Sequence, residues 1–257
     1  MDLGLDSKLI LITGATSGIG KAVAELICEE SGSVILLARN KEKLKITQDS
    51  IVEKNKYSKI YTVSADCSDL EALAEQAHFI RNNCGELDGL VINVGDGRSG
   101  EDAIPPSEIW DKTWKKNFDT ALNSARTFIP LLNPNCGSVV FVSSIAGSEA
   151  IGAPTDYSTA KAAVIAFAKN LSTKLGPNIR VNTVLPGNVL TNGGTWESRL
   201  ADNPARVNSM LSEKVPLRRL ASPEEIAVSI IFLMSERSSF TTGAVLRVDG
   251  GQSVGYM

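Results

Sequence analysis

The sequence predicts an α/β protein built on a doubly wound parallel sheet of about seven strands, with helices on both faces. Three observations indicate this class: short apolar runs rich in β-branched residues recur along the chain, amphipathic stretches of helical character separate them, and a glycine-rich turn follows the first run. Because no Pro/Gly/Ser-rich linker or repeat interrupts the pattern, we expect one domain over residues 1–257.

The expected strands need not alternate between polar and apolar residues, and Val139-Val140-Phe141-Val142 is apolar throughout. A strand covered by helices on both faces of a parallel sheet has this pattern. The seven runs are residues 8–13, 33–38, 59–64, 90–94, 138–143, 180–185 and 245–248.

The turn after the first run reads TGATSGIG over residues 13–20, and the helix that follows it is expected to end near Glu30. Such glycines permit a tight turn and a close backbone approach to a pyrophosphate, which the helix N-terminus attracts. This Rossmann-like arrangement predicts a dinucleotide site, although a turn without a ligand fits the glycines alone. A P-loop is disfavoured because Ala22, not Ser or Thr, follows Lys21.

Composition excludes several classes of protein. A net charge of -3 and dispersed basic residues argue against nucleic-acid binding, and no apolar run reaches the roughly 18 residues of a membrane span. The first residues do not resemble a signal peptide, so we expect a cytoplasmic protein. Four scattered cysteines and one histidine predict neither a metal site nor a disulfide framework.

Ligands of such sheets bind beyond the carboxyl ends of the strands, and the residues there form a site-like set. The irregular region 188–216 follows the sixth run, with a short helix expected around residues 196–210, and its length favours a substrate lid over a plain surface loop. The residues after the runs include Gly14, Arg39, Asp66, 93–95, Ser143, Ser144, Pro186 and Gly187.

Tyr157 and Lys161 are four residues apart and share the apolar face of an expected helix. Either they are a core tyrosine and a snorkelling lysine, or the lysine charge lowers the pKa of a phenol that serves as general acid or base. Ser144 or its neighbour Ser143 could then hydrogen-bond a reacting oxygen. A serine hydrolase is disfavoured because the single histidine, His78, falls in an expected helix over residues 70–82.

Together these motifs resemble the classical short-chain dehydrogenases/reductases, including the 3-oxoacyl-[acyl-carrier-protein] reductases, over nearly the whole chain. The resemblance implies hydride transfer between a nicotinamide and a carbonyl or alcohol carbon. The separation of thirteen residues between Ser144 and Tyr157 favours Ser144 over Ser143. The implied catalytic residues are Asn117, Ser144, Tyr157 and Lys161; the implied cofactor contacts are Gly14, Thr16, Ser17, Gly18, Ile19, Gly20, Arg39, Asp66, Cys67, Asn93, Gly95, Tyr157, Lys161, Pro186, Gly187, Val189 and Thr191.

Two positions bear on the cofactor. The family usually has Asn-Asn-Ala-Gly where this chain has Ile92-Asn93-Val94-Gly95, so the larger Val94 bears on the fit near the adenosine. The second strand ends in Ala38-Arg39 with no acidic residue, and arginine attracts the 2′-phosphate of NADP. We therefore expect NADP(H) rather than NAD(H), with Ser17 as a second hydrogen-bonding group and no metal.

The regions expected to border the substrate are polar. Asp96 and Glu149 favour a hydroxylated small molecule such as a sugar derivative, and Trp196 could stack on a sugar ring or cap an apolar core. The alternatives are a 3-oxoacyl thioester reductase and a non-catalytic NADP(H)-binding sensor or scaffold. By analogy with the family we expect a homotetramer, or a homodimer, with no membrane or nucleic-acid partner.

Overall fold

The fold was examined in a computed structural model that describes residues 2–55, 57–100 and 102–255. It contains one sheet of seven parallel strands in the order β3-β2-β1-β4-β5-β6-β7, which confirms the predicted class. The strands match the expected runs to within two residues at either end. They are β1 (Leu9–Thr13), β2 (Ser33–Ala38), β3 (Ile60–Ser64), β4 (Gly89–Ile92), β5 (Gly137–Val142), β6 (Ile179–Pro186) and β7 (Val245–Val248).

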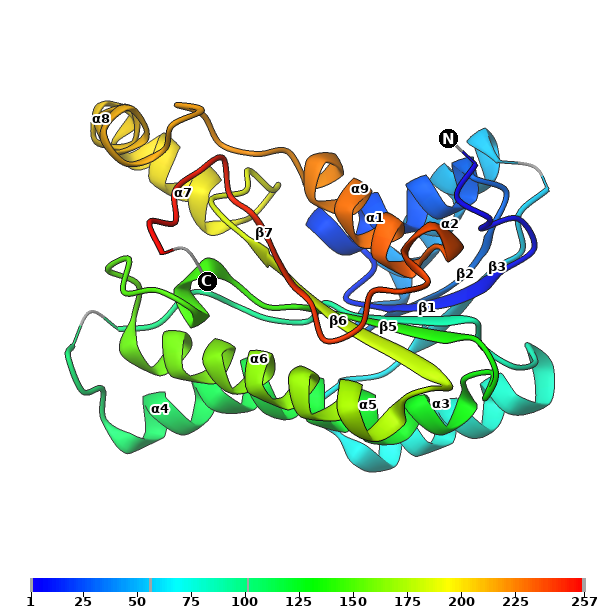
Figure 1. The fold of residues 1–257 in the computed structure, drawn as a ribbon. Helices are drawn as coiled ribbons and strands as arrows, with labels where there is room; N and C mark the ends of the chain where they lie inside the picture. The colour runs from blue at the N-terminus through cyan, green and yellow to red at the C-terminus, as the bar shows by residue number, and fades with distance from the viewer. Residues whose placement is uncertain (1, 56, 101, 256–257) are drawn as a thin grey trace.

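Helices cover both faces of the sheet (Figure 1). Side chains of β1 show why both faces must be covered: Ile10 and Ile12 enter one apolar cluster, whereas Leu9 and Leu11 enter the other. One face carries α1 (Gly18–Glu29), α2 (Lys41–Lys54) and α9 (Pro223–Met234); the other carries α3 (Leu70–Asn83), α4 (Ser107–Trp114), α5 (Thr120–Phe128) and α6 (Thr155–Leu175).

Polar side chains define where these helices begin and end. Asn40 caps α2 by accepting from the Lys43 N–H, and Asp69 caps α3 in the same way. Ser222 and Glu225 form a capping box at the start of α9. At its other end, the Arg180 guanidinium donates to three backbone carbonyls that the helix leaves unpaired. Within the described residues, none of the helices combines the length and hydropathy that crossing a membrane requires.

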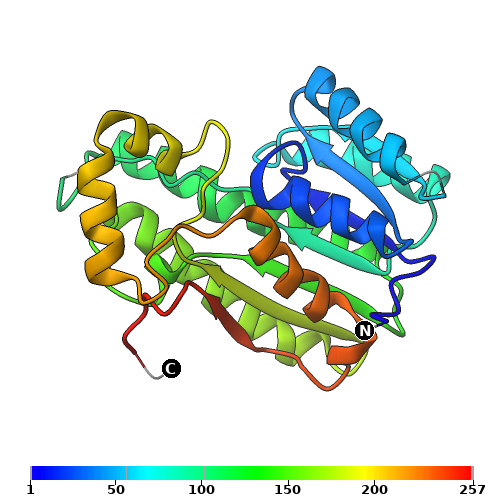
Figure 2. The ribbon, with the colours of Figure 1, turned by 90° about the horizontal axis from the view of Figure 1, so that it is seen from above.

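The region after β6 contains two helices instead of the one expected around residues 196–210. Asn203 has an extended φ of -147° and ends α7 (Thr195–Asp202), while its side chain caps α8 (Pro204–Lys214). Proline suits the first turn of the second helix because it has no N–H to leave unpaired. The pair stands apart from α1 and α2 at one end of the sheet (Figure 2) and has a small apolar cluster of its own.

Candidate active site

The glycine-rich turn lies between β1 and α1 and has a backbone that only glycine suits at several positions. Gly14 and Gly18 have φ angles of 67° and 52°, in the left-handed region. A Cβ on Gly20 would lie 2.4 Å from the carbonyl oxygen of Gly14, so no side chain fits there. The turn therefore offers bare backbone to whatever binds above it.

The N-terminus of α1 is open to an anion. Ser17 occupies the N-cap position, yet its side chain makes no capping hydrogen bond, and the first turn contains no acidic residue. The leading N–H groups of the helix and its dipole then favour a phosphate. This geometry fits the pyrophosphate of a dinucleotide, which the N–H groups of Gly18, Ile19 and Gly20 would hold.

Thr13 and Asn93 brace this turn from the neighbouring strand. The Thr13 hydroxyl accepts from the Asn93 backbone N–H at 2.9 Å, and the Asn93 side-chain amide donates to the carbonyls of Thr13 and Gly14 at 3.2 and 3.4 Å. Asn93 was expected among the cofactor contacts, and its side chain is committed to holding the turn. Val94 lies beside the same turn, with its Cγ2 atom 3.3 Å from where a Gly14 Cβ would be.

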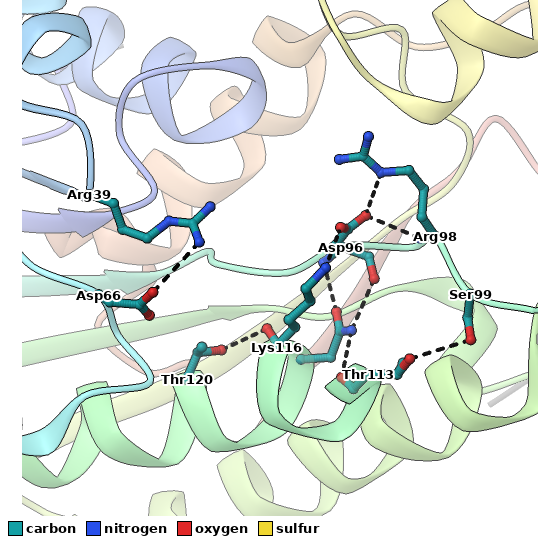
Figure 3. A network of polar contacts seen from close by, with 9 residues as sticks. Arg39, Asp66, Asp96, Arg98, Ser99, Thr113, Lys116 and Thr120 are labelled. Atoms are coloured by element: carbon teal, nitrogen blue, oxygen red, sulfur yellow. Dashed lines mark hydrogen bonds and ion pairs between the residues drawn. The ribbon is translucent and has the colours of Figure 1, made fainter. Parts of the chain in front are cut away.

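The residues expected at the adenosine end lie together at the edge formed by β2 and β3. Arg39 is 78% exposed, and its Nη1 lies 3.6 Å from the Asp66 carboxylate (Figure 3). Burial acts to raise the pKa of Asp66, but hydrogen bonds from Ser68 and the Arg39 charge lower it below its usual value. Cys67 is buried, and burial raises the pKa of its thiol to about 11, so its backbone alone could face a cofactor.

The segment after β6 closes over the glycine turn. The Thr191 methyl group would lie 3.0 Å from a Cβ on Gly18, so residues 173 positions apart are in close contact. Gly187 packs closely against the backbone of Asp249. A Cβ on Gly187 would lie 2.8 Å from the Cα of Asp249. Pro186 and Val189 border these contacts, and the placement agrees with a segment that packs against a nicotinamide.

Three of the four expected catalytic residues meet where β5 and α6 come together. Tyr157 lies in the first turn of α6, and the nearby Ser144 side chain acts to lower the pKa of its phenol. Ser143 points elsewhere: its buried hydroxyl donates to the Lys161 backbone carbonyl at 2.8 Å. The structure thus assigns the two serines different tasks, and Ser144 is the one that faces Tyr157.

Lys161 is buried one turn beyond Tyr157, at 4% exposure. Its ammonium donates to the Val142 carbonyl at 3.3 Å, and burial lowers its pKa to about 8. The expectation that Lys161 lowers the phenol pKa does not hold in this geometry. Burial raises the pKa of Tyr157 above its usual value, the Ser144 side chain opposes this, and the charge of Asp96 adds to it.

Asn117 lies in a single π-helical turn (Lys115–Asp119) between α4 and α5. π-turns are rare and occur mostly at functional sites. Its fully buried amide accepts from the Asp96 N–H at 2.9 Å and donates to the Asp96 carbonyl at 3.0 Å. A Cβ on Gly95 would lie 2.8 Å from Lys161 Nζ and 3.0 Å from Asn117 Oδ1, so the bare backbone of Gly95 brings these two groups together.

The structure gives the three expected substrate residues other partners. The Asp96 carboxylate binds the side chains of Arg98 and Lys116 at 3.0 and 3.1 Å (Figure 3). Glu149 accepts from the backbone N–H groups of Val254 and Gly255 at 2.9 and 3.0 Å. Trp196 packs within the apolar cluster of α7 and α8, and Arg199 lies 4.8 Å from its ring centroid. Glu149 is thus held by the C-terminal segment, over a hundred residues away, which no local pattern indicates.

Sequence reasoning missed several residues that support the site. Asp156, next to Tyr157, is fully buried and accepts from the Ser99 hydroxyl and from the Tyr157 N–H. Thr113 donates to Ser99 at 3.3 Å. A Cβ on Gly147 would lie 2.7 Å from the backbone of Lys161, so this glycine lets the loop after Ser144 touch α6. None of these residues belongs to a recognisable motif.

The buried charge of Lys161 leads to a stability prediction. In the unfolded chain the pKa of Lys161 returns toward 10.5. Between pH 8 and 10.5 the unfolded state therefore binds more protons at Lys161 than the folded state does. Over this range the Lys161 contribution makes the free energy of unfolding rise with pH. Lys161→Met should therefore raise the free energy of unfolding at pH 7 by up to about 3 kcal/mol. The gain should vanish by pH 10.5 in urea titrations. Lys174→Met, exposed on the same helix, is the control, and a gain that does not change with pH contradicts the prediction.

Comparison with known proteins agrees with this geometry. Residues 14–253 match the family model for enoyl-(acyl carrier protein) reductase. The chain is 34% identical to the 3-oxoacyl-[acyl-carrier-protein] reductase FabG of Thermotoga maritima, over 96% of this chain and 98% of the relative.

Two solved structures extend the comparison. L-sorbose reductase from Gluconobacter frateurii, in complex with NADPH and L-sorbose, superposes with a TM-score of 0.90 at 32% identity, covering 98% of each chain. A 3-oxoacyl-[acyl-carrier protein] reductase from Brucella melitensis with bound NAD gives a TM-score of 0.84 at 28% identity, covering 98% of this chain and 95% of the other. Fold, site and sequence agree, and the chain belongs to the short-chain dehydrogenase/reductase family of NAD(P)-dependent oxidoreductases.

Proposed function

We propose that this protein is an NADP(H)-dependent reductase of a polar ketone, with Tyr157 as the proton donor. The observation behind the proposal is the arrangement of Ser144, Tyr157 and Lys161 where β5 and α6 meet: Ser144 is near enough to the Tyr157 phenol to lower its pKa, and Lys161 is buried against the end of β5. A carbonyl that reached Ser144 and Tyr157 would meet two hydroxyl donors at its oxygen. Such an arrangement stabilises the negative charge that develops during reduction.

The state of the phenol suits proton donation. Burial raises the pKa of Tyr157, so at neutral pH the phenol keeps the proton that the reduced oxygen needs. Ser144 orients the substrate oxygen, and Asn117 holds the neighbouring loop in place through its paired bonds to Asp96. The nicotinamide supplies the hydride when it is bound. Lys161 is placed to bind the ribose hydroxyls of the cofactor and to replenish the proton of the phenol.

Arg39 supports the choice of NADP(H). It directly follows β2 and is exposed, and among the described residues its one ion-pair partner is the partly exposed Asp66, at 3.6 Å. A 2′-phosphate carries more charge than one carboxylate and would compete with Asp66 for the guanidinium. The L-sorbose reductase structure contains NADPH, whereas the Brucella reductase contains NAD, so relatives of both kinds exist.

The charged residues around Asp96 favour a polar substrate. Asp96, whose charge acts on the Tyr157 phenol, forms ion pairs with both Arg98 and Lys116. Because the Asp96 oxygens are already engaged, the donors available to a substrate are those of Arg98 and Lys116. A keto sugar or related hydroxy ketone fits this chemistry, in line with the sorbose reductase. The second candidate is a 3-oxoacyl thioester, which the names of the FabG relatives favour.

Two further elements complete the proposal. Residues 188–216, with α7 and α8, act as the substrate lid of a single domain, because an isolated bridge between Val189 and Ala221 closes the segment at its base and its helices have a separate apolar cluster. The assembly is a homotetramer. Large apolar side chains are exposed on α9 and on the edge strand β7, where monomers seldom leave them uncovered. They are Val228, Phe232, Val245 and Leu246.

Replacement of Tyr157 by phenylalanine tests the reaction. Tyr157→Phe should lower the rate of NADPH oxidation by roughly a hundredfold or more, because the general acid is lost while the ring still packs. The assay compares keto sugars with a 3-oxoacyl thioester, and Tyr61→Phe on β3 is the control. Turnover of the thioester alone would select the second candidate. NADPH binding without turnover of any carbonyl would indicate a sensor or scaffold.

Arg39→Ala tests the cofactor. Loss of a charge-assisted contact to the 2′-phosphate should reduce the preference for NADPH over NADH roughly tenfold to a hundredfold, measured as the ratio of dissociation constants. The exposed Arg81 on α3 provides the matched control, Arg81→Ala. An unchanged ratio in Arg39→Ala would reject Arg39 as the phosphate partner.

The assembly is tested by light scattering of the purified protein. A mass near four times 27.4 kDa is expected, and Phe232→Glu, which places a charge on the exposed face of α9, should yield smaller species. A monomer at all concentrations would refute the tetramer.

A further inference from the structure

Residues 96–99, which we call the strap, pass over the phenol of Tyr157 and are anchored at both ends. At the first end, Asp96 exchanges two backbone hydrogen bonds with the Asn117 amide and pairs with Lys116. At the other end, the Ser99 hydroxyl donates to the Asp156 carboxylate and accepts from Thr113. Figure 3 shows Lys116 reaching Asp96 and Thr113 reaching Ser99.

The anchors are among the least accessible polar groups of the molecule. Asn117 and Asp156 are fully buried, and Thr113 is 4% exposed. Buried polar groups that lose a partner are costly, so the strap is held firmly in its position. The position of Gly97, within the strap, relative to Tyr157 is therefore set by the structure.

Gly97 lies against the hydroxyl end of the Tyr157 phenol. The three atoms nearest to a Cβ built on Gly97 all belong to Tyr157: Cζ at 3.7 Å, Cε2 at 3.8 Å and Oη at 3.9 Å. These are ordinary van der Waals distances, and the φ of Gly97 lies outside the left-handed region. The fold would accept alanine at this position, unlike at Gly95, where a Cβ would meet Lys161 Nζ at 2.8 Å.

We propose that Gly97 determines which carbonyl compounds reach Tyr157, because its missing side chain leaves a slot beside the phenol for one of the two carbon substituents of a ketone. The inference rests on the proposed reductase function and gives a structural reason for a ketone, and not an aldehyde, as its substrate. An aldehyde has only hydrogen on one side of its carbonyl carbon and does not need the slot. A methyl group at residue 97 would occupy that space without touching the cofactor turn.

The test compares Gly97→Ala with Gly100→Ala, a control whose Cβ would lie nearest to Asp102, at 3.8 Å. Dihydroxyacetone and glyceraldehyde are isomers that differ in where the carbonyl lies, so they serve as the matched ketone and aldehyde, beside a keto sugar. Gly97→Ala should lower kcat/KM for the ketones by about tenfold or more, the usual effect of one methyl group in a pocket, and change the aldehyde value much less. Melting temperature and NADPH affinity should stay at the wild-type values.

A second readout does not depend on turnover. Tetranitromethane nitrates tyrosine at the Cε carbons, and peptide mass spectrometry follows Tyr157 separately from the exposed Tyr57, an internal standard. Nitration of Tyr157 should slow in Gly97→Ala and not in Gly100→Ala. Equal losses for ketone and aldehyde, or unchanged nitration, would overturn the role of Gly97. If the wild type reduces no carbonyl, the proposed function fails, and the nitration rates still decide whether Gly97 controls access to the phenol.

Discussion

All seven strands run in the same direction, and this constraint decides where chemistry can occur in the molecule. Parallel strands bring their carboxyl ends to one edge, and the helices on both faces leave that edge as the place where polar loops can gather. Thr13 and Asn93, eighty residues apart, meet there and brace the glycine turn. Ser144 follows β5 at the same edge, so it lies on the same side of the sheet as the glycine turn.

The site is assembled at a cost in stability that its polar contacts partly offset. Lys161 keeps an ammonium in a buried position with one carbonyl partner, a state that burial disfavours, as its pKa of about 8 indicates. The surrounding amides and hydroxyls are nearly all committed to one another: Asn117 to Asp96, Ser143 to the α6 backbone and Ser99 to Asp156. Tyr157 and Ser144, the residues that we propose meet the substrate, lie beside these committed groups.

The prediction from sequence was most accurate where local patterns suffice. Continuous β-branched runs located the strands, and the spacing of Tyr157 and Lys161 located one face of a helix. It was wrong about one helix after β6, because Asn203 ends α7 and Pro204 starts α8 at a point that apolar periodicity does not mark. Asp96 and Glu149 were expected to face a substrate, yet Lys116, Arg98 and the backbone of residues 254–255 bind these carboxylates. Charges with distant partners cannot be paired from a single sequence.

The sequence by itself determined the class of fold and the glycine turn, and it supplied the side chains that we propose as catalytic. Periodicity and short motifs indicate which faces are buried and which backbone positions need glycine. Only the tertiary structure decided the roles of the two serines, the direction of the Tyr157 pKa and the strap over the phenol. Each of these depends on groups that the chain separates and the fold brings within hydrogen-bond distance. Burial and the geometry of partner groups depend on the folded arrangement, so they cannot be inferred from short stretches of the sequence.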